Sequence, residues 1–184
     1  MPPQKLMLIR HAEKPVNPPP GGVNEQGTPD SHSLTPRGWQ RAGALVPFFV
    51  LPDKAKGIES PAILYAAGVG GAAFVIDGED ASKSERPQQT LLPLSERLAP
   101  NVPFITTFFL GQEAQLVADI QTRTGVVLVA WEHKHIPDIA SAVCPQAPQS
   151  WPDDRFDVVW ILDQVAADGY AFNQVNQTLL SGDQ

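Results

Sequence analysis

Apolar residues gather along the chain in short continuous runs, and stretches of helical periodicity separate these runs. The runs at 6–9 (LMLI) and 126–131 (VVLVAW) have no polar interruption. A run of this kind, bounded by polar or turn-forming residues, is typical of a strand that is buried on both faces. We predict strands at 6–9, at 62–66, within 102–110, at 125–133, at 157–165 and near 170–175.

The stretches between these runs carry the signals of helices. From 34 to 50, Ala42, Leu45 and Phe49 recur at helical spacing, and Thr35 is a good N-cap residue. Helices are predicted at 34–50, at 84–98 with Ser84 as the cap, at 111–125 with Gly125 as the terminator, and at 136–144.

The alternation of strands and helices predicts an α/β fold, a three-layer α/β/α sandwich with a mainly parallel sheet. The length of 184 residues suits one domain with a substantial core, so 1–184 is expected to be a single domain. Two segments fall outside the alternation. The loop 12–33 is rich in Pro, Gly and Asn, and the glycine-rich segment 67–83 is expected to form an extra hairpin or a loop. Long loops in small domains are usually functional or mobile.

Charge and composition exclude several partners. The formal net charge of −7 argues against nucleic acid or an anionic membrane surface. No apolar stretch approaches the length of a membrane span, and the first residues are unlike a signal peptide, so a cytoplasmic location is expected. The single cysteine, Cys144, cannot form a disulfide within the chain and is expected to be structural. The oligomeric state is left open.

The candidate chemistry lies where the predicted strands end. Arg10 and His11 directly follow the first strand, and Glu132 and His133 follow the strand at 125–133. Arg86 begins a helix, where backbone N–H groups already favour anions. In open α/β sheets, ligands bind beyond the carboxyl ends of the strands. Several cationic donors at that edge suit the three oxygens of a phosphoryl group better than a carboxylate.

These residues resemble the motifs of the histidine phosphatase superfamily, which has the phosphoglycerate-mutase-like fold. Arg10-His11-Ala12 is similar to its Arg-His-Gly signature after the first strand, with Ala12 in place of the glycine. The segment 34–42 (LTPRGWQRA) and the segment 83–90 (KSERPQQT) are similar to two further motifs, the second of them carrying Arg86. His133 follows a late buried strand, as the second histidine of that family does. The resemblance spans about residues 5–140 in the expected order.

The resemblance implies a phosphatase that acts through a phosphohistidine. His11 would attack phosphorus, and Arg10, Arg86 and His133 would hold the phosphoryl oxygens. A neutral imidazole is a fair nucleophile near neutral pH, and cationic donors stabilise the transferring group. No organic cofactor or metal is implied. The expected partner is a phosphorylated small molecule or a phosphoprotein, and a mutase activity is not expected, because the sequence has no motif for it.

The general acid is not assigned by the sequence. Its candidates are Glu132, Glu113 and Glu13, and a substrate with a good leaving group would need none. Lys14 and Lys134 are expected to be solvated or to help attract an anionic substrate. Substrate contacts are expected from loop 12–33, from segment 67–83 and from the residues around 134–137.

Two other classes of function use the same residues. The first is a metal site, because His11, Glu13, Glu132, His133 and His135 are all ligand types. Arg10 and Arg86 would place positive charge against such a cation. The second is a protein that binds a phosphorylated ligand without turnover, which the missing general acid leaves open.

Overall fold

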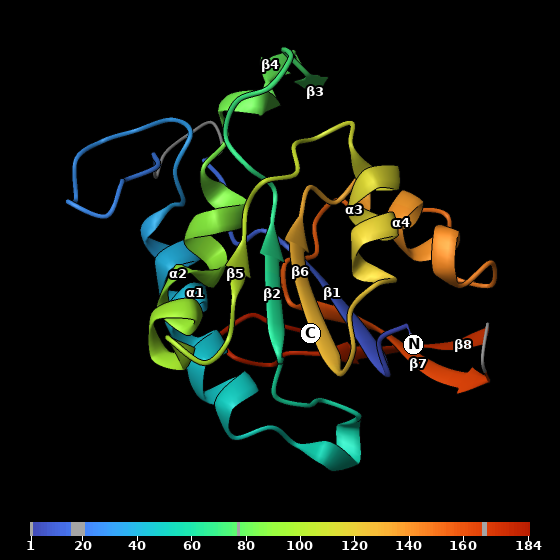
Figure 1. Ribbon diagram of the computed structural model, residues 1–184. Coiled ribbons are helices and arrows are strands. Elements are labelled where there is room, and N and C mark those ends of the chain that lie inside the picture. The colour runs from blue at the N-terminus through green and yellow to red at the C-terminus, as the bar shows by residue number, and fades with distance from the viewer. Residues whose placement is uncertain (1, 16–20, 77, 167–168) are drawn as a thin grey trace.

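The computed structural model describes residues 2–15, 21–76, 78–166 and 169–184, and it has the predicted α/β architecture (Figure 1). The main sheet has the strand order β5-β2-β6-β1-β7-β8, and β3 pairs with β4 in a separate small hairpin. The strands are β1 (Lys5–Arg10), β2 (Ile63–Ala66), β3 (Val75–Ile76), β4 (Glu79–Asp80), β5 (Phe104–Ile105), β6 (Val126–Trp131), β7 (Val158–Ala166) and β8 (Gly169–Asn176). The helices are α1 (Pro36–Val50), α2 (Arg86–Leu98), α3 (Glu113–Ile120) and α4 (Ile136–Val143), with short 3₁₀ turns at Lys54–Lys56 and Ala81–Lys83.

The sheet is parallel from β5 through β2 and β6 to β1, and antiparallel from β1 through β7 to β8. The apolar runs that predict β1 and β6 are buried at every position, because both strands lie inside the sheet with helices on both faces. The expected mainly parallel three-layer fold is therefore confirmed.

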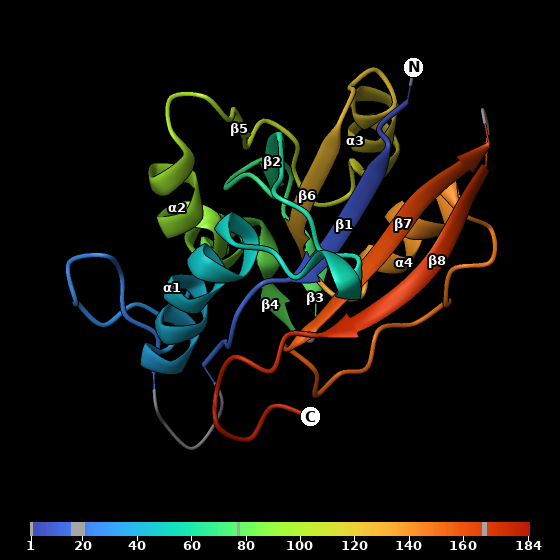
Figure 2. The same cartoon turned by 90° about the horizontal axis from the view of Figure 1, so that it is seen from below.

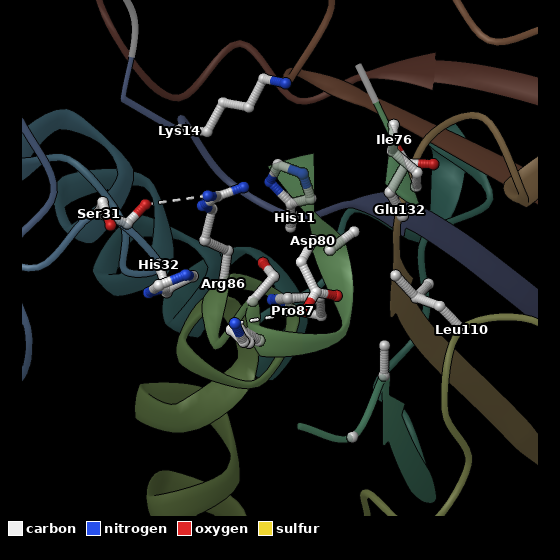
Figure 3. Close-up of a pocket in the computed structure, with 15 residues that line it drawn as sticks. His11, Lys14, Ser31, His32, Ile76, Asp80, Arg86, Pro87, Leu110 and Glu132 are labelled. Atoms are coloured by element: carbon white, nitrogen blue, oxygen red, sulfur yellow. Dashed lines mark hydrogen bonds and ion pairs between the residues drawn. The ribbon is translucent and has the colours of Figure 1, made fainter. Parts of the chain in front are cut away.

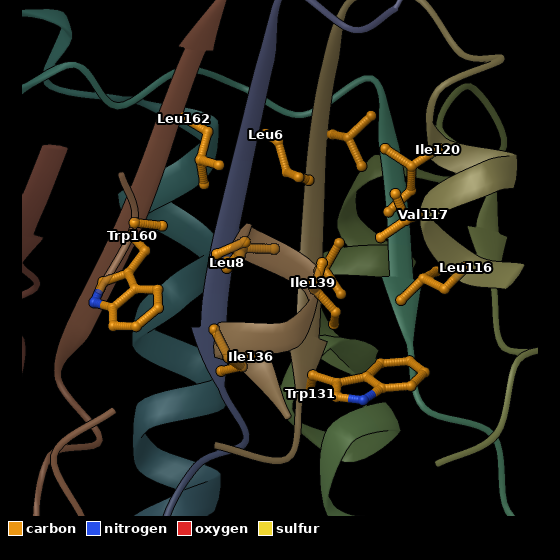
Figure 4. Packing of buried hydrophobic residues seen from close by; sticks show 14 of the residues in the cluster. Leu6, Leu8, Leu116, Val117, Ile120, Trp131, Ile136, Ile139, Trp160 and Leu162 are labelled. Atoms are coloured by element: carbon orange, nitrogen blue, oxygen red, sulfur yellow. The ribbon is translucent and has the colours of Figure 1, made fainter. Parts of the chain in front are cut away.

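Side chains alternate between two cores along each central strand. Met7 and Ile9 of β1 pack against α1 and α2, whereas Leu6 and Leu8 pack on the face covered by α3 and α4 (Figures 1 and 4). Trp131 and Trp160 belong to the core under α3 and α4. Cys144 is fully buried in the same core, as expected of a structural cysteine. These two packed faces fix the sheet, and with it the edge where the candidate residues lie.

The start of α1 agrees with the sequence prediction, whereas the start of α2 and the end of α3 differ from it. Thr35 caps α1 as predicted, because its hydroxyl accepts a hydrogen bond from the Gly38 N–H at 3.1 Å. Helix α2 instead begins after Glu85, with Ser84 one residue too early to cap it. Helix α3 stops at Ile120 rather than running to Gly125, because the next residues close tight turns onto Asp119 and Ile120. Gly125 has φ +82° and turns the chain into β6.

Candidate active site

The pairing of β1 with β6 brings the two histidine motifs together. The strands run parallel with Arg10 opposite Trp131, so both chains leave the sheet at the same level. The His11 N–H donates to the Trp131 carbonyl at 3.0 Å, which carries the pairing one residue past the strand. As a result, Arg10-His11 and Glu132-His133 lie at one edge of the sheet, although more than a hundred residues separate them in the sequence.

His11 is 3% exposed, and its ring has a defined tautomer. Nδ1 lies 2.7 Å from the Ala12 carbonyl oxygen, which can only accept, so Nδ1 carries the proton and Nε2 has the lone pair. Burial lowers the pKa of His11 well below its usual value, and the charges of Arg10 and Arg86 lower it further. The imidazole is therefore neutral at pH 7, which is the form in which nitrogen acts as a nucleophile.

Arg10 is 2% exposed and is held by a loop that the sequence analysis did not single out. Its Nη1 donates to the Asp153 carbonyl at 2.5 Å and to the Arg155 carbonyl at 3.4 Å. Its guanidinium carbon lies 3.8 Å from the centre of the Phe156 ring, a cation–π contact. Burial lowers the pKa of Arg10 to about 10, so the side chain stays cationic at neutral pH.

Arg86 is the first residue of α2, and its side chain enters the same site from the other side. Nη2 donates to the Ser31 carbonyl at 3.0 Å, which fixes the guanidinium to the loop 12–33. Figure 3 shows the guanidinium pointing toward the His11 ring across a shared cavity. The helix start adds positive potential at the same place.

His133 lies between two carboxylates. Its Nε2 is 3.1 Å from Asp153 Oδ1, and its Nδ1 is 2.6 Å from Glu132 Oε1. Burial acts to raise the pKa of Glu132, but the interaction with His133 and the Lys134 backbone N–H outweigh it, and the pKa of Glu132 lies below its usual range. Glu132 is therefore ionised in the unliganded site.

A cavity of about 310 Å³ opens over His11 and Arg86. Of the three regions expected to contact substrate, loop 12–33 and segment 67–83 contribute to its wall, and residues 16–20 and 77 of these two lie outside the described residues. Its remaining lining residues are Lys14, Ser31, His32, Ala67, Gly68, Ile76, Asp80, Ala81, Lys83, Ser84, Pro87, Leu110 and Glu132. The β3–β4 hairpin of segment 67–83 stands above the carboxyl ends of β2 and β6 (Figure 1). Among the described residues, positions 134–137 contribute nothing to this wall, since His135 contacts Phe74 and Ile136 is in the core.

The three acid candidates are separated by the fold. Glu132 lines the cavity with His11. Glu113 accepts hydrogen bonds from the Trp131 indole at 3.0 Å and from the Gly111 N–H, outside the described cavity wall. Glu13 turns away from His11 toward Arg41. Of the two lysines, Lys14 lines the cavity, whereas Lys134 is exposed and lies outside that wall.

Thr90 connects the loop that carries His11 to the helix that carries Arg86. Its hydroxyl accepts from the Ala12 N–H at 2.8 Å and donates to the Arg86 carbonyl at 2.7 Å, and the residue is fully buried. In the sequence Thr90 belongs to the motif at 83–90, but the motif does not show which groups its side chain contacts. The structure therefore supplies the physical reason for a hydroxyl at this position.

Thr90→Val should lower the free energy of unfolding by about 1–3 kcal/mol, because it leaves the buried Ala12 N–H without an acceptor. Thr90→Ser keeps the hydroxyl and should retain the Ala12 bond, losing only the methyl packing. Urea unfolding of the two variants measures the difference. Equal losses in both variants would show that packing, and not this hydrogen bond, holds the two elements.

Glu13 belongs to a separate charge cluster next to the site. Arg41, which is 2% exposed, binds the Glu13 carboxylate at 2.8 Å and the Asp183 carboxylate at 2.7 Å. The segment after β8 turns back toward α1 to bring Asp183 there (Figure 2). This cluster fixes the chain two residues beyond His11.

Asp183 makes the stability of this cluster depend on pH. Burial alone would raise the pKa of Asp183, but hydrogen bonds from Arg41 and from the Leu179 and Leu180 N–H groups lower it to about 2. A depressed folded-state pKa stabilises the fold above the unfolded pKa of about 3.9, and the contribution is lost as the pH falls toward 2.

Asp183→Asn should therefore lower the free energy of unfolding by about 2 kcal/mol at pH 7. As the pH falls from about 4 to 2, the variant should lose less stability than the native chain does. Urea unfolding at pH 7, 4 and 2.5 measures both effects. The exposed Asp154→Asn variant is the control and should follow the native curve. If the stability of Asp183→Asn ran parallel to that of the native chain across this pH range, a lowered pKa of Asp183 would be contradicted.

Within 2–15, 21–76, 78–166 and 169–184, no three His, Cys, Asp or Glu side chains are grouped so that they could hold a metal ion. Across the same residues, no helix combines the length and the apolar character needed to cross a bilayer.

Comparison with known proteins identifies the fold. No family model matches the chain, and no curated protein does. Among solved structures, the protein histidine phosphatase SixA in complex with tungstate aligns over 94% of this chain and 97% of its own, with TM-score 0.52 and 13% identity. A mycobacterial glucosyl-3-phosphoglycerate phosphatase with inorganic phosphate aligns over 94% and 95%, with TM-score 0.43 and 15% identity. The alignment with SixA confirms the predicted resemblance at the level of the fold.

Proposed function

We propose that this chain, which shares the fold of the histidine phosphatase SixA, hydrolyses phosphomonoesters through a phosphohistidine at His11. The observation that carries the proposal is the state of His11, a buried neutral imidazole with Nδ1 protonated and Nε2 available. Arg86 lines the same cavity as His11, and the charges of Arg10, Arg86 and His133 all act to lower the pKa of His11. This set of groups suits a nucleophile and the donors for a transferring phosphoryl group.

The reaction has two steps. His11 Nε2 attacks phosphorus, the P–N bond forms, and the bond from phosphorus to the leaving oxygen breaks, so the alcohol departs with a proton from an acid. Water then attacks phosphorus and gives a proton to the conjugate base of that acid, the P–N bond breaks, and inorganic phosphate leaves as His11 returns to its neutral form. Arg10 and Arg86 would stabilise the charge on the phosphoryl oxygens in both steps.

Glu132 is the proposed proton donor to the leaving oxygen. It is the acid candidate that shares the cavity with His11 and Arg86, and it is 7% exposed. In the free site its pKa is lowered, so it must gain a proton when substrate enters. An arriving phosphoryl dianion raises the pKa of a nearby carboxylate, which is the direction that a general acid needs.

Glu132→Gln should lower kcat on alkyl phosphates by about 10²-fold or more, because these leaving groups need a proton. Its effect on p-nitrophenyl phosphate should be much smaller, since nitrophenolate leaves without one. Glu113→Gln is the matched control, since Gln keeps the acceptor for Trp131, and it should affect both substrates equally. If Glu132→Gln lowered kcat equally on alkyl phosphates and on p-nitrophenyl phosphate, Glu132 would not be the proton donor.

The cavity of about 310 Å³ is large enough for a phosphoryl group and a small organic group beside it, either a small molecule or a side chain presented by a phosphoprotein. A panel of phosphoesters, with phosphohistidine and phosphoserine peptides among them, tests the proposal directly. Release of inorganic phosphate from any of them supports it. Tight binding of phosphate with no release from any substrate would favour a ligand-binding protein instead.

A further inference from the structure

The loop 151–157 contacts Arg10 and is anchored at both ends by buried residues. Trp151 is 4% exposed, packs against Trp160 with the rings tilted by 40°, and donates from its indole to the Arg155 carbonyl at 2.9 Å. Asp157 is also buried and accepts a backbone bond from Gln177 at 2.7 Å. Asp153 and Asp154 are exposed between these two anchors, and the Asp153 backbone is held by its contact with Arg10.

Asp153 contacts two of the proposed phosphoryl donors. Its backbone carbonyl accepts from Arg10 Nη1, and its carboxylate Oδ1 lies 3.1 Å from His133 Nε2. The side chain is 86% exposed, so apart from the contact with His133 it faces solvent. It can swing outward without losing buried apolar contacts, while the backbone contact with Arg10 stays.

The Asp153 carboxylate adds a second negative charge beside His133, on the opposite side of the ring from Glu132. Arg10 and Arg86 are nearly buried, and the negative charges of Glu132 and, after it, Asp153 oppose the effect of burial on the pKa of Arg10. A phosphoryl oxygen that accepted from His133 Nε2 would meet Asp153 Oδ1 at the same nitrogen. Two anions at one donor repel, so only one of them can use it at a time.

We propose that Asp153 is an internal competitor for the phosphoryl group, with its carboxylate bound to His133 Nε2 in the free protein and displaced when substrate or product phosphate enters. This rests on the proposed function, since it assumes that His133 receives the phosphoryl group. Asp153 thereby sets the affinity of the site for phosphate and speeds the release of the product at the expense of binding strength.

The test compares Asp153→Asn with Asp154→Asn, which makes the same change in net charge one residue away. Asp154 is exposed, and no hydrogen bond joins it to His133 in the part of the chain that the structure describes. Calorimetric titration with inorganic phosphate and with tungstate measures the affinity directly, independent of turnover. Both positions are exposed, so both variants should fold, which circular dichroism checks.

Asp153→Asn should bind phosphate about 2- to 5-fold more tightly than the native chain, the size expected when one solvent-exposed charge contact is removed. Asp154→Asn should stay close to the native value. Equal gains in the two variants, or no gain in Asp153→Asn, would overturn the proposal, as would a loss of kcat in Asp153→Asn with unchanged phosphate affinity. If the native chain and both variants all fail to bind phosphate, it is the proposed function that fails.

Discussion

His11→Asn should lower kcat on p-nitrophenyl phosphate by about 10⁴-fold or more, the largest effect expected of any single substitution here. Asparagine keeps an amide that can bond near the Ala12 carbonyl, but it has no lone-pair nitrogen with which to attack phosphorus. The Arg10 and Arg86 guanidinium groups remain in place. The variant should therefore still bind inorganic phosphate while it fails to turn over.

His135→Asn is the matched control for this substitution. His135 lies outside the cavity wall and contacts Phe74 and Asp138. Its removal should leave kcat within a few-fold of the native value. Turnover by His11→Asn within about 10-fold of the native chain would mean that another group attacks phosphorus.

Arg86→Ala should lower kcat/KM by about 10²–10³-fold, the loss typical when one preorganised donor to a developing charge is removed. The guanidinium adds its charge to the start of α2, and the alanine removes this charge from a cavity whose wall it shares with His11. The loss should fall on kcat more than on KM, because the donor is needed most in the transition state. Steady-state kinetics on p-nitrophenyl phosphate measures it.

Arg97→Ala provides the control on the same helix. Arg97 is exposed in the last turn of α2, far along the helix from the cavity, so its loss changes net charge but not the site. It should keep native kinetics. An equal decrease of kcat/KM in both variants would show that Arg86 acts only through its long-range charge.

The sequence predicts the sheet well because its central strands are unusually simple. β1 and β6 are covered on both faces, so nearly every position is apolar and the runs are unmistakable. Polar residues directly after such runs must leave the sheet at its carboxyl edge. This local rule places Arg10, His11 and His133 together, and the register of β1 with β6 confirms it.

The contacts between distant segments could not be predicted. Glu13 is an acid candidate by residue type and by its place two residues after His11, but its carboxylate is bound by Arg41 and Arg37, and Asp183 binds the same Arg41. Asp183 lies far away in the sequence, and it reaches Arg41 only because the segment after β8 turns back. No periodicity or motif encodes a pairing of this kind.

The loop 151–157 is the other feature that the sequence does not reveal. It contains no motif, and its contacts with Arg10 use backbone carbonyl groups, which every residue has. Phe156 lies against Arg10, but from the sequence alone this phenylalanine could equally belong to the hydrophobic core. Only the tertiary structure shows that this loop completes the site.

Trapping of the phosphoenzyme tests the central claim most directly. The native protein, mixed with a labelled phosphoester and quenched within a turnover, should carry acid-labile and alkali-stable phosphate on the peptide that contains His11. The His11→Asn variant should carry none under the same conditions. Phosphate on a different residue, or turnover with no covalent phosphate on the protein, would contradict the account.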